Sequence, residues 1–406
     1  MGFRYPKGGF ITAFYDPLKV PDAPTIGTAT EGDAQASVTF TAPTNVGGSA
    51  ITSYTAVSTP GGISASAASS PITVTGLSNG TAYTFKVWAL NTYGPSPYSA
   101  ASGSVTPNAY AYFGGGSLNG TRTADVQRVA FGTSGNAASF ASLTEARNYI
   151  GACSSSTRGV WAGGRDNNVI DVNTIDFITL ASGGGGSDFG DLTVARIQPA
   201  GASNNTRGLF AGGLSPAKTV IDYITLASTG NATNFGSLPV GIYGAGGCAS
   251  STRAVWLGGS TSGGDAGRNT IYYVTIASTG NAVSFGELNY KTLDTTACSN
   301  STRGLVMGGR SGSSASPAVR YNTIEYITIA STGNSTDFGD LTQAVQYLAS
   351  AASSIYAIRS GGSTSGSATN VMDYVTIAST GNATDFGDMT AVIEQHAGCS
   401  NGHGGL

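Results

Sequence analysis

The stretch Asn322-Thr-Ile-Glu-Tyr-Ile-Thr-Ile-Ala-Ser331 decides the fold, because closely similar stretches recur along the chain. Apolar and polar residues alternate in it, which indicates a β-strand with one buried face. A turn, Ser331-Thr-Gly-Asn334, and a second short strand at Asp337-Phe-Gly-Asp340 follow it. An earlier copy, Asn173-Thr-Ile-Asp-Phe-Ile-Thr-Leu-Ala-Ser182, has the same pattern. The pattern therefore predicts a repeated β unit.

A Gly-Gly pair after an apolar strand marks each copy of this unit. The pairs lie at intervals of 49, 49, 46, 50 and 53 residues and begin at Gly114, Gly163, Gly212, Gly258, Gly308 and Gly361. Each copy contains four short strands, and this number and repeat length are typical of a propeller blade. We therefore predict an all-β protein with a six-bladed β-propeller over residues 108–406. The strand Ala109–Phe113 should close the ring by lying beside the strand that ends at Gly398–Asn401.

The repeat period and the strand-ending Gly-Gly resemble kelch-type repeats. The tryptophan that this family carries late in each repeat is absent here, so the resemblance implies a fold and no activity.

Length variation within the repeats is confined to one loop. From the second Gly of the pair to the aromatic position of the next strand the distance ranges from 10 to 17 residues, whereas the other spacings stay at 12, 13 and 11. Insertions in repeat proteins map to one face, which is often the binding face. The predicted ligand-binding residues are Arg165, Asp166, Asn167, Lys218, Asp265, Arg268, Arg310, Arg320 and Tyr321. Plain solvated loops are an equally weighted interpretation.

Composition excludes several classes of function. Charged residues make up 10% of the 406 residues and the net charge is −3, so no basic stripe is available for nucleic acid or an anionic membrane. The two histidines, His396 and His403, leave little for a histidine-based triad or a multi-histidine metal site. No paired carboxylates recur as a glycosidase would need. We expect no catalytic residues, no metal and no cofactor.

Two further residue types recur in register. The four cysteines, Cys153, Cys248, Cys298 and Cys399, occupy one repeat position, and adjacent sheets are about 10 Å apart. That separation exceeds the reach of a disulfide, so we expect buried free thiols.

Arg158, Arg207, Arg253 and Arg303 precede the first strand of their repeats. We expect each to tie a turn to a carbonyl or to an Asp such as Asp191, with an anion-binding ring as the alternative.

Residues 20–107 have the short alternating strands and turns of a β-sandwich. They resemble a fibronectin type III domain through Pro21-Asp-Ala-Pro24 and Leu77-Ser-Asn-Gly-Thr-Ala-Tyr83-Thr-Phe-Lys-Val87. Tyr83 stands where the tyrosine corner of that family falls, and Phe40 replaces a tryptophan that many members carry. The resemblance implies a spacer.

The chain as a whole resembles bacteriophage virion proteins of the appendage, fibre or head-decoration type. The resemblance is carried by Pro21–Thr30, by Gly47–Thr52 and by the repeated Ile-Ala-Ser-Thr-Gly-Asn-Ala-Thr-Asp-Phe-Gly-Asp phrase. It implies a location in the virion, assembled in the host bacterial cytoplasm, in several copies or as a homo-oligomer. The sequence also shows no signal peptide and no run of eighteen apolar residues.

Residues 1–19 are then predicted to be an arm that attaches the chain to other virion proteins. The expected attachment residues are Phe3, Tyr5, Phe10, Ile11, Phe14 and Tyr15, which are too apolar for a free tail. Packing of the arm onto its own sandwich is the alternative.

For the propeller we expect non-enzymatic binding of a host-surface glycan or receptor. A purely structural cement protein and a polysaccharide depolymerase are the competing hypotheses.

Overall fold

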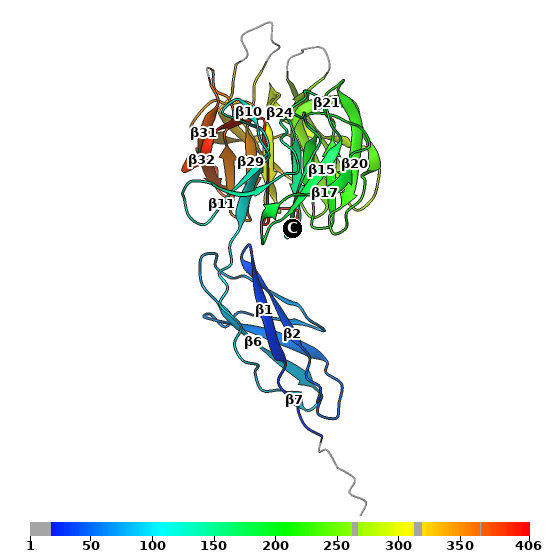
Figure 1. Ribbon diagram of the computed structural model, residues 1–406, viewed down its shortest axis with the longest axis vertical. Helices are drawn as coiled ribbons and strands as arrows, with labels where there is room; N and C mark the ends of the chain where they lie inside the picture. The colour runs from blue at the N-terminus through cyan, green and yellow to red at the C-terminus, as the bar shows by residue number, and fades with distance from the viewer. Residues whose placement is uncertain (1–17, 262–266, 312–318, 366) are drawn as a thin grey trace, which may run out of the picture. The chain divides into compact units, whose positions relative to one another are not determined.

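The computed structural model describes residues 18–261, 267–311, 319–365 and 367–406. Two compact units, Met1–Pro107 and Asn108–Leu406, divide the chain. Every helix or strand assigned in the described residues is a β-strand, as the all-β prediction requires (Figure 1). The predicted attachment residues Phe3, Tyr5, Phe10, Ile11, Phe14 and Tyr15 lie outside the described residues.

The first unit contains two antiparallel sheets. One sheet has the order β1-β2-β5 and the other the order β4-β3-β6-β7. Their bounds are β1 Thr25–Gly32, β2 Gln35–Thr41, β3 Ser53–Thr59, β4 Ser64–Ala67, β5 Ile72–Thr75, β6 Thr84–Asn91 and β7 Gly94–Pro95. Alternate residues of these strands are fully buried, among them Val38, Ala56 and Val87. The period-two pattern of the sequence is thus the pattern of this core.

Tyr83 makes the contact expected of a tyrosine corner. Its ring is buried, and its hydroxyl accepts a hydrogen bond from the backbone N–H of Ser78 at 3.1 Å. Phe40 is also buried and packs against Tyr54 with ring centroids 4.6 Å apart. A phenylalanine therefore fills the place of the expected tryptophan without exposing the core.

Three serines at a three-residue spacing cover the edge of β6. Ser96, Ser99 and Ser102 donate their N–H groups to carbonyls of β6. Their hydroxyls accept the N–H groups of Ala89, Val87 and Phe85, each at 2.9 Å. Backbone and side chain of every third residue thus satisfy a strand edge that would otherwise be open.

The described residues of the second unit form five sheets of repeated strands, one of which has seven strands because the long strand β21 pairs on both sides. Their orders are β13-β14-β15-β17, β18-β19-β20-β21-β22-β23-β24, β25-β26-β27-β28, β29-β30-β31-β32-β9-β10 and β33-β8-β11-β12-β16. The bounds are β8 Tyr110–Gly114, β9 Ser117–Leu118, β10 Thr121–Arg122, β11 Asp125–Ala130, β12 Ala138–Ser142, β13 Gly151–Ser154, β14 Arg158–Ala162, β15 Thr174–Thr179, β16 Gly184–Gly185, β17 Ser187–Asp191, β18 Ala200–Ser203, β19 Arg207–Ala211, β20 Lys218–Thr225, β21 Thr233–Ala249, β22 Arg253–Ser260, β23 Arg268–Thr275, β24 Val283–Thr292, β25 Thr296–Ser299, β26 Arg303–Met307, β27 Thr323–Thr328, β28 Thr336–Asp340, β29 Ala349–Ala352, β30 Tyr356–Ser360, β31 Thr369–Thr376, β32 Thr384–Glu394 and β33 Ala397–Ser400.

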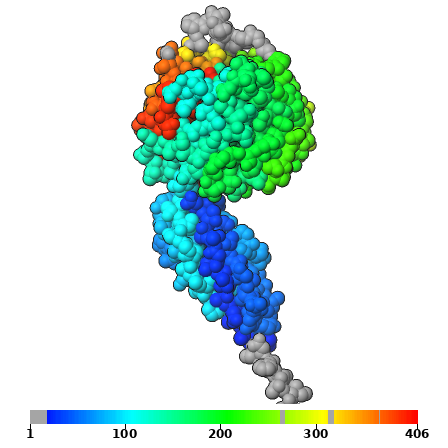
Figure 2. Space-filling view, in the orientation of Figure 1, coloured from blue at the N-terminus to red at the C-terminus, as the bar shows by residue number. Residues whose placement is uncertain are grey.

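The strands that hold the cysteine position contact one another in a cyclic order. β13 contacts β18, and contacts continue through β21, β25, β29 and β33 back to β13. The five-stranded sheet joins both ends of the unit, because β33 pairs antiparallel with β8 and places Cys399 opposite Tyr112. This pairing of 111–114 with 397–400 is the one expected from the sequence. Figure 2 shows the cyan segment that holds β9 beside the red segment that holds β32, with which it pairs.

The recurring arginines connect neighbouring repeats. Each guanidinium donates to a carbonyl just beyond the aromatic strand of the next repeat, as Arg158 does to Leu226 at 2.9 Å and Arg253 to Ile329 at 2.9 Å. Each also lies over an aromatic ring of its own sheet, Phe177 in the case of Arg158. The expected tie to a carbonyl is confirmed, and none of the described ion pairs joins these arginines to an Asp.

Candidate ligand-binding site

Six residues with left-handed backbone, here called the left-handed ring, precede the cysteine positions of β13, β18, β21, β25, β29 and β33, which are called the inner strands below. Each lies four residues before the cysteine position of its repeat, with φ between 55° and 64°: Tyr149, Gln198, Gly244, Asp294, Tyr347 and Gln395. Backbone hydrogen bonds link several neighbours, such as Gln198 N–H to Tyr149 O at 2.7 Å and Gln395 N–H to Tyr347 O at 2.8 Å. Five members are not glycine, although this conformation is strained for other residues. Strain of this kind concentrates at functional sites.

The ring residues line a cavity of about 80 Å³. The walls are completed by Ile150, Pro199, Ala245, Thr295, Leu348 and His396. Tyr149, Gln198, Tyr347 and Gln395 are half-buried, so ring side chains remain accessible to solvent. The variable loops begin at this end, since Arg165 and Arg310 form bridges with Asn148 and Leu293, which directly precede two ring residues.

Asp294 is the electrostatic centre of this cavity. Its carboxylate accepts hydrogen bonds from Gln198 Nε2 at 2.8 Å and from Arg310 Nε at 2.7 Å. Tyr347 also hydrogen-bonds to it. Burial raises the pKa of Asp294, and the Arg310 charge opposes that rise. The three partners come from different repeats, so this carboxylate connects three repeats through hydrogen bonds.

The remaining titratable groups of the cavity are neutral. Tyr149 and Tyr347 lie edge to face with ring centroids 5.7 Å apart, and burial raises the pKa of both phenols. Burial, reinforced by the Arg359 charge, lowers the pKa of His396 to about 3, so its imidazole is uncharged. Because Asp294 is paired with Arg310, the cavity carries no net charge.

The predicted residues Arg310, Arg320 and Tyr321 lie close together. Arg310 is bound to Asp294, and its backbone bridges Arg320. Tyr321 packs against Tyr290 with ring centroids 4.5 Å apart. The sequence had suggested exposed loop residues, whereas the Arg310 side chain is only 18% exposed because it neutralises a buried carboxylate.

The other predicted residues are more dispersed. Arg165 forms an ion pair with Asp171 at 2.7 Å, and Asp166 accepts N–H groups of its own turn from Asn168 and Ile170. Asn167 is exposed in that turn. Lys218 and Arg268 begin β20 and β23 and are half-buried, while Asp265 lies outside the described residues.

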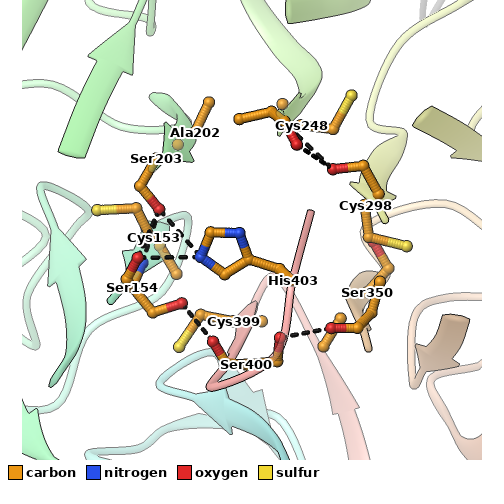
Figure 3. Close-up of a pocket in the computed structure, with 18 of the residues that line it drawn as sticks. Cys153, Ser154, Ala202, Ser203, Cys248, Cys298, Ser350, Cys399, Ser400 and His403 are labelled. Atoms are coloured by element: carbon orange, nitrogen blue, oxygen red, sulfur yellow. Dashed lines mark hydrogen bonds between the residues drawn. The ribbon is translucent and has the colours of Figure 1, made fainter. Parts of the chain in front are cut away.

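A second, smaller cavity of about 50 Å³ lies among the inner strands. His403 occupies the middle of the residues that surround it, and the cysteine sulfurs point away from that middle (Figure 3). His403 Nε2 lies 3.0 Å from Ser154 O, and Gly404 N–H donates to Ser299 O at 2.8 Å. A Cβ at Gly404 would come within 1.9 Å of Asn300 O, so only glycine fits there. The segment 401–406 thus packs against the last residues of the inner strands, at the ends away from the left-handed ring.

Sequence reasoning missed the left-handed ring and the buried ion pairs. The four thiols agree with expectation, since all are buried and free. A signal for the ring existed, because polar residues or glycine recur four residues before every cysteine position. A signal for the ion pairs was the acidic residue inside an otherwise apolar strand, as at Asp176, Asp222 and Asp373.

Within the described ranges, no helix is long and apolar enough to cross a membrane. The same residues include no group of three or more His, Cys, Asp or Glu side chains suited to hold a metal ion.

A search of curated proteins finds no match. Residues 22–104 match the model of the fibronectin type III domain. The chain therefore contains a fibronectin type III domain, at the place where Pro21–Pro24 and Tyr83 had indicated one.

Proposed function

We propose that residues 108–406 form a closed six-bladed β-propeller of kelch-like architecture. The cyclic contacts of the inner strands support closure, and so does the pairing of β33 with β8. Each blade on this proposal is one four-stranded sheet with the cysteine strand innermost. Closure leaves no unpaired inner edge, which a single sheet would expose.

We propose further that the propeller binds a hydroxyl-rich ligand, such as a host-surface glycan, at its variable-loop end. The observation that carries this proposal is the cavity inside the left-handed ring, with tyrosine, glutamine and a neutralised Asp294 on its walls. Aromatic faces with a few fixed polar groups are the usual composition of a small-ligand site. The single carboxylate is engaged by Arg310, and the phenols stay protonated, which favours binding over covalent chemistry.

The setting proposed for this binding is a bacteriophage particle. The support is the sequence resemblance to virion appendage and decoration proteins, together with a fibronectin type III spacer between the first residues and the repeats. On this proposal residues 1–19 attach the chain to other virion proteins, and several copies present their propellers to the host.

An array of bacterial lipopolysaccharides and capsular polysaccharides, probed with the labelled full chain, tests the binding proposal. We expect selective binding that Tyr347→Phe weakens at least tenfold, with Tyr98→Phe in the first unit as the matched control. Tyr98 is 55% exposed and does not line the cavity. Absence of binding to every polysaccharide would favour a cement protein, and release of shortened glycan would favour a depolymerase.

A further inference from the structure

Two glutamines of the ring, Gln198 and Gln395, line the cavity, and each has one amide atom without a hydrogen-bond partner among the described residues. Asp294 can only accept hydrogen bonds, so the Gln198 atom 2.8 Å from it is Nε2. The Oε1 atom of Gln198 then has no partner among the described residues. The orientation of this amide is therefore fixed by chemistry, and an acceptor is left free.

The orientation of Gln395 follows from a longer chain of contacts. Arg122 Nε can only donate, so it fixes Asn148 Oδ1 at 3.0 Å. Asn148 Nδ2 must then face Gln395, whose Oε1 accepts from it at 2.7 Å. The Nε2 group of Gln395 is left without a partner in the part of the chain that the structure describes.

The size and charge of the cavity limit what these two groups can bind. A volume of about 80 Å³ is too small for a whole sugar ring and large enough for a substituent of a few heavy atoms. A buried ion would lack a counter-charge there, because Arg310 already neutralises Asp294 and His396 is uncharged. The substituent is therefore neutral, with one hydrogen-bond acceptor and one donor.

We propose that the cavity receives the acetamido group of an N-acetylated sugar. Its carbonyl accepts from Gln395 Nε2, its N–H donates to Gln198 Oε1, and its methyl group packs on apolar walls such as Ile150 and Leu348. The inference rests on the proposed glycan binding and specifies the sugar class. A plain hexose has no acetamido group, so it cannot offer a neighbouring N–H donor, carbonyl acceptor and methyl group to these three parts of the cavity.

Calorimetric titration of the full chain with N-acetylglucosamine, N-acetylgalactosamine and glucose tests the inference. We expect both acetylated sugars to bind at least tenfold more tightly than glucose. Gln395→Glu keeps the acceptor for Asn148 but removes the free donor, so it should weaken acetylated-sugar binding at least tenfold. Gln35→Glu in β2 makes the same charge change outside the cavity and should have no effect.

Three results would overturn the inference. The first is equal binding of acetylated sugars and glucose, and the second is full affinity in a folded Gln395→Glu variant. The third is equal competition by an N-acetylated dipeptide amide, which would show recognition of an amide rather than of a sugar. Array binding to polysaccharides without acetamido groups would overturn this inference alone, whereas absence of all glycan binding would also overturn the proposed function.

Discussion

Three ion pairs are completely buried in the repeats: Arg147 with Asp176, Arg196 with Asp222, and Arg359 with Asp373. In the second pair Asp222 also accepts from Thr193 Oγ1 at 2.6 Å and from Thr193 N–H at 3.1 Å. Removing one partner of such a pair leaves an uncompensated charge in the core. These arginines therefore contribute to folding, and they do not line the ligand cavity.

Asp222→Ala should lower the free energy of unfolding by about 3–5 kcal/mol, because it leaves the buried Arg196 charge without its partner. The double variant Arg196→Met with Asp222→Leu should recover most of that loss. Arg165→Ala, which breaks a pair whose side chains are 29% and 18% exposed, should cost under about 1 kcal/mol. Urea denaturation measures all three, and equal losses for the first and last variants would contradict the interpretation.

The cysteines should react slowly in the native protein. Burial raises the pKa of all four thiols, to about 12 for Cys298 and Cys399, so almost no thiolate forms at neutral pH. We expect four free thiols per chain to be labelled after denaturation and fewer than one in the folded state. Mass spectrometry after alkylation counts the free thiols. A disulfide in the unreduced protein would contradict the prediction that the cysteines occupy equivalent positions too far apart to pair.

His396 should make stability depend on pH. Its pKa falls from the ordinary 6.5 to about 3 in the folded protein. The unfolded chain therefore binds more protons between these values, and the free energy of unfolding decreases as the pH is lowered from 6.5 toward 3. His396→Gln should reduce this dependence. Urea denaturation at pH 7 and pH 4.5 compares the two proteins, and parallel losses would exclude His396 as a cause.

At the scale of elements, the serine segment along β6 replaces a regular edge strand. Each of Ser96, Ser99 and Ser102 uses both its N–H and its hydroxyl, so the side chain takes the place of a carbonyl acceptor. This arrangement needs serine at every third residue and leaves little backbone for pairing with another chain.

Ser99→Ala should leave the buried N–H of Val87 without an acceptor, at a cost of about 1–3 kcal/mol. Amide exchange in Thr84–Asn91 should become at least tenfold faster. Ser104→Ala changes an exposed serine of the same stretch and serves as the control. Hydrogen exchange with mass spectrometry measures both, and unchanged exchange in Ser99→Ala would show that the hydroxyl is dispensable.

At the scale of the whole molecule, the proposed closure of the repeats depends on the last strand. β33 is the inner partner of β8, and segment 401–406 fills the inner cavity beside it. Deleting residues 397–406 should expose the edge of β8 and unfold the repeats, while the fibronectin type III domain remains folded. Limited proteolysis and calorimetry should show loss of one transition, and removal of Leu406 alone is the control. An unchanged calorimetric profile would argue against closure.

The sequence by itself determined the features that depend on local periodicity or on register. Alternation predicted the strands, and the need to close the repeats predicted that the strand Ala109–Phe113 would lie beside the one ending at Gly398–Asn401. The resemblance to a fibronectin type III domain predicted the tyrosine corner at Tyr83. The buried thiols also followed from register, since equivalent residues of repeated units share one environment. Apart from the tyrosine corner, which rests on the family resemblance, these inferences need only neighbouring residues or the repeat itself.

Only the tertiary structure decided the candidate site. Asp294 meets Gln198 across 96 positions of sequence, and Asn148 meets Gln395 across 247. No local pattern specifies such contacts, because they join residues of different repeats that lie far apart in the sequence. The same long-range packing binds Arg310 to a buried carboxylate although its place in the sequence is a variable loop. The scaffold could therefore be read from periodicity, whereas the cavity chemistry required the fold.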